Sequence, residues 1–392
     1  GAAVFVGSEP NRLAISDNGA VLYVSLDGAN AVRKFDVPTK TPGAQFSFGS
    51  DSFFGPYRAQ DMAVAPGQPD VLAVSRLRPS VSPGHGGVAI FDNGVPRSLT
   101  TPDHTGSNVI EFSKSPEILY GQNTETTEFG FRRMAVGSCG VITVRTIQSL
   151  LSGFGLDFRV DNGVAYSSGG RAVDPEAGNI LGTFMIVNPG SFLSGSVLVA
   201  PDAKARKVYY LLNDGGQTIL QVFDSKTFIR LGALRLPGVT SSSSSLVRWG
   251  TNGLAFRTST QVYLLQNALI GGQDPDFVPA PIPPSPTSSA VVNISSFNGD
   301  PGGVTLNVTG SITTTGTTDS NGSATIQGIS PCSSITITPS KPNYFFSPAS
   351  QTISNPTAST PVNFQATRKT IGFQFSGATV SEVNGRVGIT VT

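Results

Sequence analysis

The stretch PNRLAISDNGAVLYVSLDGANAVRKFD at residues 10–36 holds an apolar strand, an Asn-Gly turn, a second apolar strand, a short polar gap and a third strand. The stretch SSLVRWGTNGLAFRTSTQVYLLQ at residues 244–266 repeats the same order. Asn-Gly suits tight hairpin turns because both residues tolerate positive φ. A unit that recurs so far along one chain predicts a repeat architecture built from β-meanders.

Aligning the turn of the first unit along the chain reveals four more copies, which begin near residues 61, 108, 156 and 195. The starts are about 40–50 residues apart, the usual length of a four-stranded propeller blade. The strands are short and apolar on both faces, and such a sheet needs a cover on each side. Because helical periodicity is almost absent, we predict an all-β fold with a six-bladed β-propeller over residues 1–270. If the ring is truncated at its N-terminus, the native blade number is seven.

The sixth unit lacks a fourth strand, because Pro and Gly take over at residue 271. The first residues, GAAVFVGS, have the character of the outer strands GAQFSFGS at 43–50 and LGALRLPG at 231–238. We therefore expect residues 2–7 to supply the missing outer strand and to close the ring. A second recurrent turn contains Asp36, Asp174 or Asp224, to which we assign backbone-binding roles in Asx-turns.

Composition changes after the ring. Residues 271–289, GGQDPDFVPAPIPPSPTSS, are predicted to form an extended, semi-rigid Pro-rich linker. Residues 290–367 carry only three charges, and several segments alternate with period two, which is typical of half-buried strands. We predict a β-sandwich over residues 290–368, in which Asp319 and Asn321 belong to a hairpin turn rather than to a calcium loop.

Three resemblances refine this division. RLAISDNGAVLYVSLDGANAVRKFD resembles the bacterial secreted propellers of the YVTN or lactonase-like kind. VTLNVTGSITTTGTTDSNGSATIQGIS resembles the carboxypeptidase regulatory-like, or prealbumin-like, β-sandwich. IGFQFSGATVSEVNGRVGITVT resembles the opening of a Calx-β domain, which makes residues 369–392 a partial domain or an assembly strand. The last resemblance implies a Ca²⁺-binding role for Glu382, although the other acidic positions of that family have no match here.

Several charged residues fall on the predicted inner strands, which line the channel of a propeller. They are Arg12, Asp61, Glu111, Asp157, Arg159 and Arg248. Two interpretations stay open: a ligand-binding site at one mouth of the channel, or a structural set of ion pairs. Trp249 lies on the same kind of strand, where we expect packing rather than ligand stacking.

The residues that most often bind metals are sparse. His85 and His104 stand in Gly- and Pro-rich surroundings without a ligand spacing such as HxxxH, so we predict exposed loop residues and no metal. Cys139 and Cys332 fall in different predicted domains, and we expect two buried thiols rather than a disulfide.

The function expected from these features is non-enzymatic. No nucleophile elbow, phosphate loop or dinucleotide fingerprint occurs, and no cofactor is expected. The net charge of +1 gives no electrostatic case for nucleic acid, and no apolar run could insert into a membrane. We predict a secreted or cell-surface modular protein acting in adhesion, extracellular matrix or filament assembly, with protein or glycan partners that include other copies of itself through β-strand addition. The alternative is a lactonase-like hydrolase or a ligand-sensing propeller that uses the channel mouth.

Overall fold

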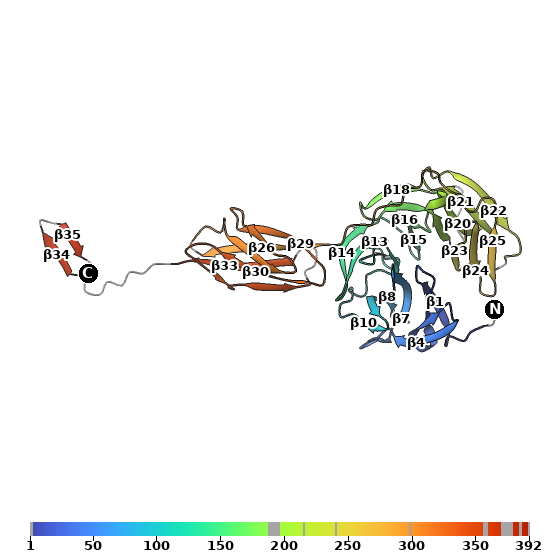
Figure 1. Ribbon diagram of the computed structural model, residues 1–392, viewed down its shortest axis with the longest axis horizontal. Helices are drawn as coiled ribbons and strands as arrows, with labels where there is room; N and C mark the ends of the chain where they lie inside the picture. Colours follow the sequence, from blue (N-terminus) through green and yellow to red (C-terminus); the bar gives the residue numbers. More distant parts are fainter. Residues whose placement is uncertain are drawn as a thin grey trace. The chain divides into compact units, whose positions relative to one another are not determined.

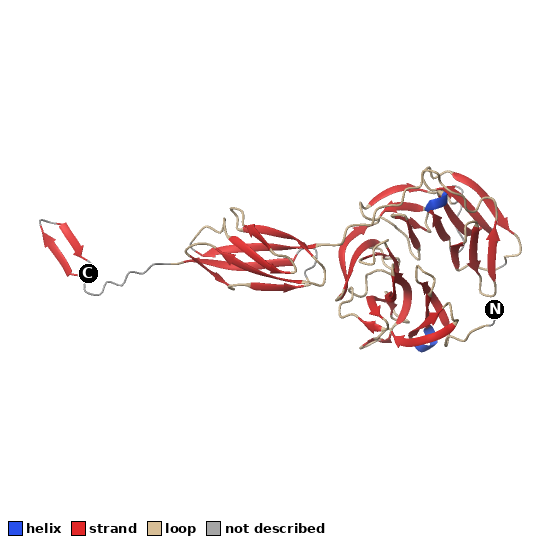
Figure 2. Cartoon of the chain, viewed as in Figure 1, coloured by secondary structure: helices blue, strands red, loops and turns tan. Residues whose placement is uncertain are grey.

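The computed structural model describes residues 3–186, 197–214, 216–239, 241–297, 299–355, 360–369, 379–383 and 386–390. These residues form strands, turns and two short 3₁₀ helices, η1 (Asp27–Ala29) and η2 (Ala203–Ala205), so the all-β prediction is confirmed (Figures 1 and 2). The chain divides into two compact units. The first comprises Gly1–Ser288 with Ser330–Cys332, and the second comprises Ser289–Ile329 with Ser333–Thr392.

The first unit is a propeller whose six described sheets follow one another along the chain (Figure 1). Within each sheet, successive strands pair as antiparallel neighbours, which is the meander that the repeated turns predict. The first three sheets contain β1 (Pro10–Ile15), β2 (Val21–Leu26), β3 (Ala31–Asp36), β4 (Thr41–Ser47); β7 (Arg58–Ala65), β8 (Gln68–Leu77), β9 (His85–Asp92), β10 (Val95–Pro96); and β11 (Val109–Phe112), β12 (Ile118–Gln122), β13 (Gly130–Gly137), β14 (Gly140–Gln148).

The remaining ring sheets have the same build up to the last one, which has three strands in the described part of the chain. A two-stranded ribbon lies in the connection between the first and second sheets. These strands are β15 (Phe158–Asp161), β16 (Val164–Ser167), β17 (Arg171–Asp174), β18 (Asn179–Thr183); β19 (Leu198–Asp202), β20 (Lys207–Asp214), β21 (Gln217–Asp224), β22 (Arg230–Leu236); β23 (Ser245–Trp249), β24 (Gly253–Arg257), β25 (Val262–Gln266); and β5 (Ser50–Asp51), β6 (Gly55–Pro56).

Five apolar cores hold these sheets together, one at each junction between successive sheets. At the first junction, Tyr23 packs with Leu72 and Phe91. At the last, Tyr209 of the fifth sheet packs with Leu254 of the sixth. The three intermediate junctions contain clusters of the same kind. Burial of apolar side chains on both faces of a sheet therefore holds the ring together, as the sequence pattern indicates.

The predicted closure of the ring by the N-terminus is wrong. Residues 3–7 form no strand, and the sixth sheet ends at β25. The N-terminal segment instead lies along the first sheet, where the Arg33 Nε–H donates to the Val6 carbonyl at 3.2 Å. The Asp27 N–H donates to the Glu9 carbonyl at 2.9 Å. An outer-strand composition does not select which sheet a short terminal segment joins.

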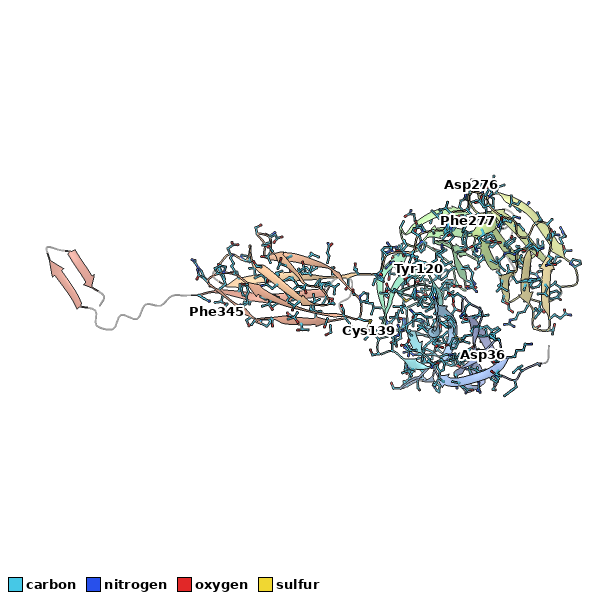
Figure 3. All side chains as sticks on the ribbon, in the orientation of Figure 1. Asp36, Tyr120, Cys139, Asp276, Phe277 and Phe345 are labelled. Atoms are coloured by element: carbon cyan, nitrogen blue, oxygen red, sulfur yellow. A yellow bond between two sulfur atoms is a disulfide. The ribbon has the colours of Figure 1, made fainter. Side chains whose placement is uncertain are left out.

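The Asx-turns are confirmed. Oδ1 of Asp36 accepts the Thr39 N–H at 2.7 Å (Figure 3). Oδ1 of Asp174 accepts the N–H groups of residues 176 and 177, each at 2.9 Å. Oδ1 of Asp224 accepts those of residues 226 and 227 at 2.9 and 2.8 Å. Each carboxylate therefore satisfies the backbone donors of the turn between the third and fourth strands of its sheet.

The second unit contains two four-stranded sheets that enclose one core. The first sheet has the parallel pair β26–β33 at its centre. Along the strands, every second side chain is buried between the two sheets, for example Val292, Leu306 and Phe364. The sheet orders are β29-β26-β33-β31 and β28-β27-β30-β32. The strands are β26 (Ser288–Phe297), β27 (Thr305–Gly310), β28 (Thr314–Thr317), β29 (Ser323–Ile329), β30 (Ser334–Ser340), β31 (Tyr344–Ser347), β32 (Gln351–Ser354) and β33 (Thr360–Arg368).

Two local predictions concern this unit. Oδ1 of Asp319 accepts the N–H groups of Asn321 and Ser323, which confirms the hairpin turn. Near the C-terminus, β34 (Thr379–Val383) pairs with β35 (Arg386–Thr390). The side chain of Glu382 and the residues on either side of this hairpin lie outside the described part of the chain.

Cys139 and Cys332 form a disulfide, so the expectation of two free thiols is wrong (Figure 3). The bond joins residues 193 positions apart, and Cys332 belongs to the first unit together with Ser330 and Pro331. Sequence reasoning placed the two cysteines in different domains by their position along the chain. It could not show that Ser330–Cys332, which interrupt the second unit along the chain, belong to the first unit.

We expect the Cys139→Ser, Cys332→Ser double variant to be destabilised by about 2–5 kcal/mol, because a long closed loop lowers the entropy of the unfolded chain. Urea denaturation measures the loss. Peptide mapping without reduction should recover a peptide pair joined through the two cysteines. Alkylation of both cysteines in the native, unreduced protein would contradict the bond.

Candidate functional site

The first strand of each ring unit is an inner strand, as predicted. Strands β1, β7, β11, β15, β19 and β23 lie next to one another in that order around the centre of the ring (Figure 1). Successive side chains of an inner strand point to the two faces of its sheet, so those of neighbouring inner strands meet beside the channel. The predicted charged residues on these strands are therefore brought to the middle of the propeller.

Four of the six predicted residues form one charged cluster. The Arg159 guanidinium on β15 donates from Nη1 to Glu111 Oε1 on β11 at 2.9 Å. Its Nη2 lies 2.9 Å from Oδ2 of Asp157, which stands just before β15. Asp61 on β7 completes the cluster, and its Oδ2 accepts the Ile110 N–H at 2.8 Å. One guanidinium thus pairs with two carboxylates and feels the charge of a third, that of Asp61.

This imbalance of charge perturbs two of the carboxylates. Burial in the centre of the ring raises the pKa of Asp61 to about 6, and the negative charge of Asp157 adds to the effect. Burial also raises the pKa of Glu111 to about 7, although the Arg159 charge opposes the shift. The side chains of Glu111 and Arg159 are 28% and 38% exposed, so solvent still reaches them from the channel. Asp61 and Glu111 therefore both change charge near neutral pH.

The other two predicted residues do not join the cluster. Arg12 on β1 acts on Asp61 through its charge alone, and no ion pair is described for it. Arg248 on β23 pairs with Asp202 of β19 at 2.8 Å and lies 5.5 Å from the centre of the Tyr209 ring. The Arg248 pair bridges the fifth and sixth sheets, so it supports their junction.

The prediction for the histidines is half wrong. His104 is exposed, but His85 is fully buried at the start of β9. Its Nε2 accepts the Ser107 N–H at 3.3 Å, and a Cβ on Gly106 would lie only 2.1 Å from the imidazole. Burial and the charges of Arg132 and Arg76 lower the pKa of His85 to about 3. The Gly and Pro residues around His85 suggested an exposed loop. In the structure, the missing side chain of Gly106 leaves the space that the buried imidazole occupies.

Sequence reasoning missed the role of the Pro-rich segment. Residues 274–284 run along the propeller and are hydrogen-bonded to it, and we call them the strap. The Lys114 Nζ donates to the Ala280 carbonyl at 3.1 Å and to Asn162 Oδ1 at 2.8 Å. Asn162 Nδ2 donates to the Val278 carbonyl at 3.0 Å. Arg133 Nη2 donates to the Pro284 carbonyl at 3.0 Å.

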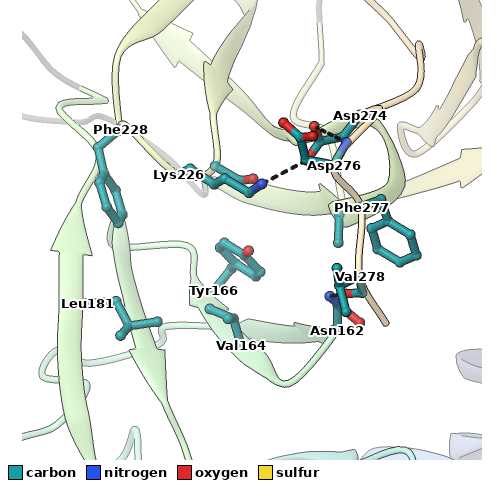
Figure 4. A pocket seen from close by; sticks show the side chains of 12 residues that line it. Asn162, Val164, Tyr166, Leu181, Lys226, Phe228, Asp274, Asp276, Phe277 and Val278 are labelled. Atoms are coloured by element: carbon teal, nitrogen blue, oxygen red, sulfur yellow. Dashed lines mark hydrogen bonds and ion pairs between the residues drawn. The ribbon is translucent and has the colours of Figure 1, made fainter. Parts of the chain in front are cut away.

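The strap forms one wall of each of two cavities. The larger, of about 600 Å³, is lined by Tyr120, Asp161, Glu176 and the strap residues 280–284. The smaller, of about 400 Å³, lies between the fourth and fifth sheets (Figure 4). Figure 4 shows Lys226 reaching Asp274 across its upper rim, an ion pair of 3.0 Å. The only sequence signal for these cavities was the length and rigidity of the Pro-rich run.

Polar groups that line the larger cavity are already engaged. Glu176 pairs with Arg133 at 2.8 Å and accepts the Tyr120 hydroxyl at 2.7 Å. Asp161 Oδ2 accepts the Ala203 N–H at 2.6 Å. In the described ranges, no three His, Cys, Asp or Glu side chains are placed to hold a metal ion. These contacts fix the strap and the sheets, so the central cluster is the stronger candidate site.

Comparison with known proteins identifies the fold. The sequence matches no family profile and no curated protein. Hydrazine synthase from Kuenenia stuttgartiensis is similar in structure, with a TM-score of 0.51 and 14% identity over 66% of this chain and 84% of that one. The Cps50 (Swd1) β-propeller domain from Myceliophteria thermophila has a TM-score of 0.50 and 12% identity over 65% and 82%. At such identities the likeness concerns the fold alone, and it is that of a β-propeller.

Replacing Glu111 by Gln should flatten part of the pH dependence of stability. The pKa of Glu111 is raised in the folded state, so its contribution is full below about pH 4.5 and is lost as the pH rises toward about 7. Urea denaturation at about pH 5 and about pH 8 should show a smaller decline in the variant than in the parent. Glu117→Gln, which changes an exposed carboxylate in the turn between β11 and β12, is the control. Equal declines in parent and Glu111→Gln would contradict the titration.

His85 should act in the opposite direction. Its folded-state pKa is lowered, so stability is present above about 6.5 and is lost as the pH falls toward about 3. One extra proton on the unfolded chain gives a slope of about 1.4 kcal/mol per pH unit. His85→Gln should remove that slope, while the exposed His104→Gln should keep it. Parallel denaturation profiles for the parent and His85→Gln would show that His85 is protonated in the fold.

Proposed function

We propose that this chain acts outside the cell as a non-enzymatic binding and scaffolding protein, in adhesion, extracellular matrix or filament assembly. The Cys139–Cys332 disulfide is the observation that supports an extracellular location, because disulfides persist in oxidising compartments and are rare in the cytosol. The described residues include no helix of the length and apolarity that a membrane span needs. The likeness to secreted bacterial YVTN-type propellers agrees with this assignment.

The binding role rests on the central cluster. Arg159 forms ion pairs with Glu111 of the neighbouring inner strand and with Asp157 at the start of its own strand, which fixes polar groups beside the channel without pairing a nucleophile with a base. Such a fixed polar mouth suits recognition of a hydroxylated or peptidic partner by hydrogen bonds. The sandwich is similar to prealbumin-like spacers, and the C-terminal segment to the start of a Calx-β domain. We propose protein or glycan partners, including other copies through β-strand addition.

One observation favours the second function, a lactonase-like hydrolase. Asp61 and Glu111 have pKa values of about 6 and about 7, which is the range of a general acid or base at neutral pH. The channel mouth would then bind a small ester or lactone. A ligand-sensing propeller would use the same residues without turnover.

The two functions are distinguished by one variant. Asp61→Asn with Glu111→Gln keeps the size of both side chains and removes their titration. We expect the parent to show no hydrolysis of aliphatic lactones and to bind glycan or protein arrays, and Arg159→Ala to weaken that binding. Lactone hydrolysis by the parent that is lost in the double variant would replace our proposal with the hydrolase. Thiols at both cysteines in protein isolated from its producing cells would contradict the extracellular location.

A further inference from the structure

The polar contacts of strap residues 278–284 are all made by backbone atoms, because every side chain in this run is apolar. Asn162, in the turn between β15 and β16, holds the run with its side-chain amide (Figure 4). The amide Nδ2–H donates to the Val278 carbonyl at 3.0 Å, and Oδ1 accepts the Ala280 N–H at 2.6 Å. The two bonds lie on either side of Pro279, so they recognise an extended backbone rather than a side chain.

Two cationic side chains of the third sheet hold the same run. The Lys114 Nζ donates to the Ala280 carbonyl at 3.1 Å, and the Arg133 Nη2 donates to the Pro284 carbonyl at 3.0 Å. Because Asn162 belongs to the fourth sheet, the run lies across the junction of the third and fourth sheets. We call this binding surface the strap groove. Its polar contacts read the conformation of the bound chain, so they do not require the strap's own side chains.

The proline pattern prepares the run for this kind of binding. Every residue from 278 to 286 is a proline or directly precedes one. Proline fixes its own φ and pushes the residue before it into the extended region. The run therefore favours the polyproline II conformation before it docks, and it loses little conformational entropy on docking. Any segment with the same proline pattern has this advantage.

The strap fits the strap groove loosely over most of its length. The larger cavity, of about 600 Å³, lies between strap residues 280–284 and side chains of the third and fourth sheets, which include Phe112, Tyr120, Val160 and Val164. Val278 and Ile282 of the strap are 74% and 69% exposed. The strap therefore buries little apolar surface. Grooves lined by aromatic side chains are the usual docking sites of Pro-rich segments.

One contact of the strap is tight. Gly163 follows Asn162 in the turn, and a Cβ on this glycine would lie 3.0 Å from the Ala280 Cβ. The turn backbone thus approaches the strap closely at Ala280. The strap groove therefore accepts a small side chain at this position, which selects segments that have a small residue between two prolines.

We propose that the strap groove is a receptor site for a Pro-rich segment of a partner protein, and that the strap occupies it as an internal ligand. The partner segment is an extended run with a small residue between two prolines, which Asn162 and Lys114 hold by its backbone. A segment that fills the cavity better than the strap displaces it. This inference does not depend on the proposed function, because the residues that line the cavity differ from those of the central charged cluster.

The test compares the full-length parent with an open variant, in which residues 278–284 are replaced by a Gly-Ser run of the same length. The probe is a fluorescent peptide with the sequence of residues 276–286, and its anisotropy measures binding. We expect the open variant to bind the peptide. The parent should bind it about tenfold more weakly, because the tethered strap competes at a high effective concentration. A peptide with alanine in place of every proline should bind the open variant much more weakly.

A matched pair of substitutions in the open variant locates the binding. Asn162→Ala should weaken the peptide by about tenfold, because two hydrogen bonds to its backbone are lost. Asn93→Ala should leave binding unchanged, since Asn93 also has positive φ and precedes a glycine in a turn, but on the second sheet. Ala280→Leu in the otherwise unchanged chain opens the strap groove by a second route, because the larger side chain cannot lie against Gly163.

Four results would overturn the proposal. The first is that neither the open variant nor the Ala280→Leu variant binds the peptide more tightly than the parent does. The second is equal binding by the open variant with and without Asn162→Ala. The third is equal binding of the proline and alanine peptides. The fourth is a parent that never binds the peptide at any concentration, since the strap would then be a permanent part of the propeller.

Discussion

A sheet with two apolar faces cannot stand alone in water, and this constraint organises the propeller. Each of the four inner sheets of the ring buries one face against its predecessor and the other against its successor, so the cores at the five junctions depend on one another. Loss of one sheet would expose two faces at once. The meander within each sheet is local, but its stability comes from neighbours that are often remote in sequence.

The same stacking determines where charge can gather. Because the first strand of every unit faces the centre, residues from different repeats meet there without any local sequence signal. Arg159 lies among three carboxylates, and the arrangement leaves Asp61 and Glu111 with raised pKa values. The strap is held on the propeller by polar side chains. Lys114 and Asn162, which come from sheets earlier in the chain, donate hydrogen bonds to its backbone.

Features set by periodicity were predictable from the sequence. The six units, the Asx-turns at Asp36 and Asp174, and the inner-strand position of Glu111 all follow from local pattern. Features set by long-range packing were not. The burial of His85, the course of residues 3–7 and the Cys139–Cys332 bond each depend on contacts between segments that no periodicity relates. Trp249, expected to pack in a core, is exposed for the same reason.

The disulfide also changes how the chain would carry mechanical load. Tension applied between the two ends passes through the covalent path, which crosses from Cys139 to Cys332 through the sulfur atoms. The residues between them lie outside that covalent path while the bond is intact; they include β14, the fourth to sixth ring sheets, the strap and strands β26 to β29. Fully extended, they would span roughly 600–700 Å. Reduction would place these residues in the path of the load, so that their unfolding under tension could release this length, and the bond makes the chain's extensibility depend on the redox state of its surroundings.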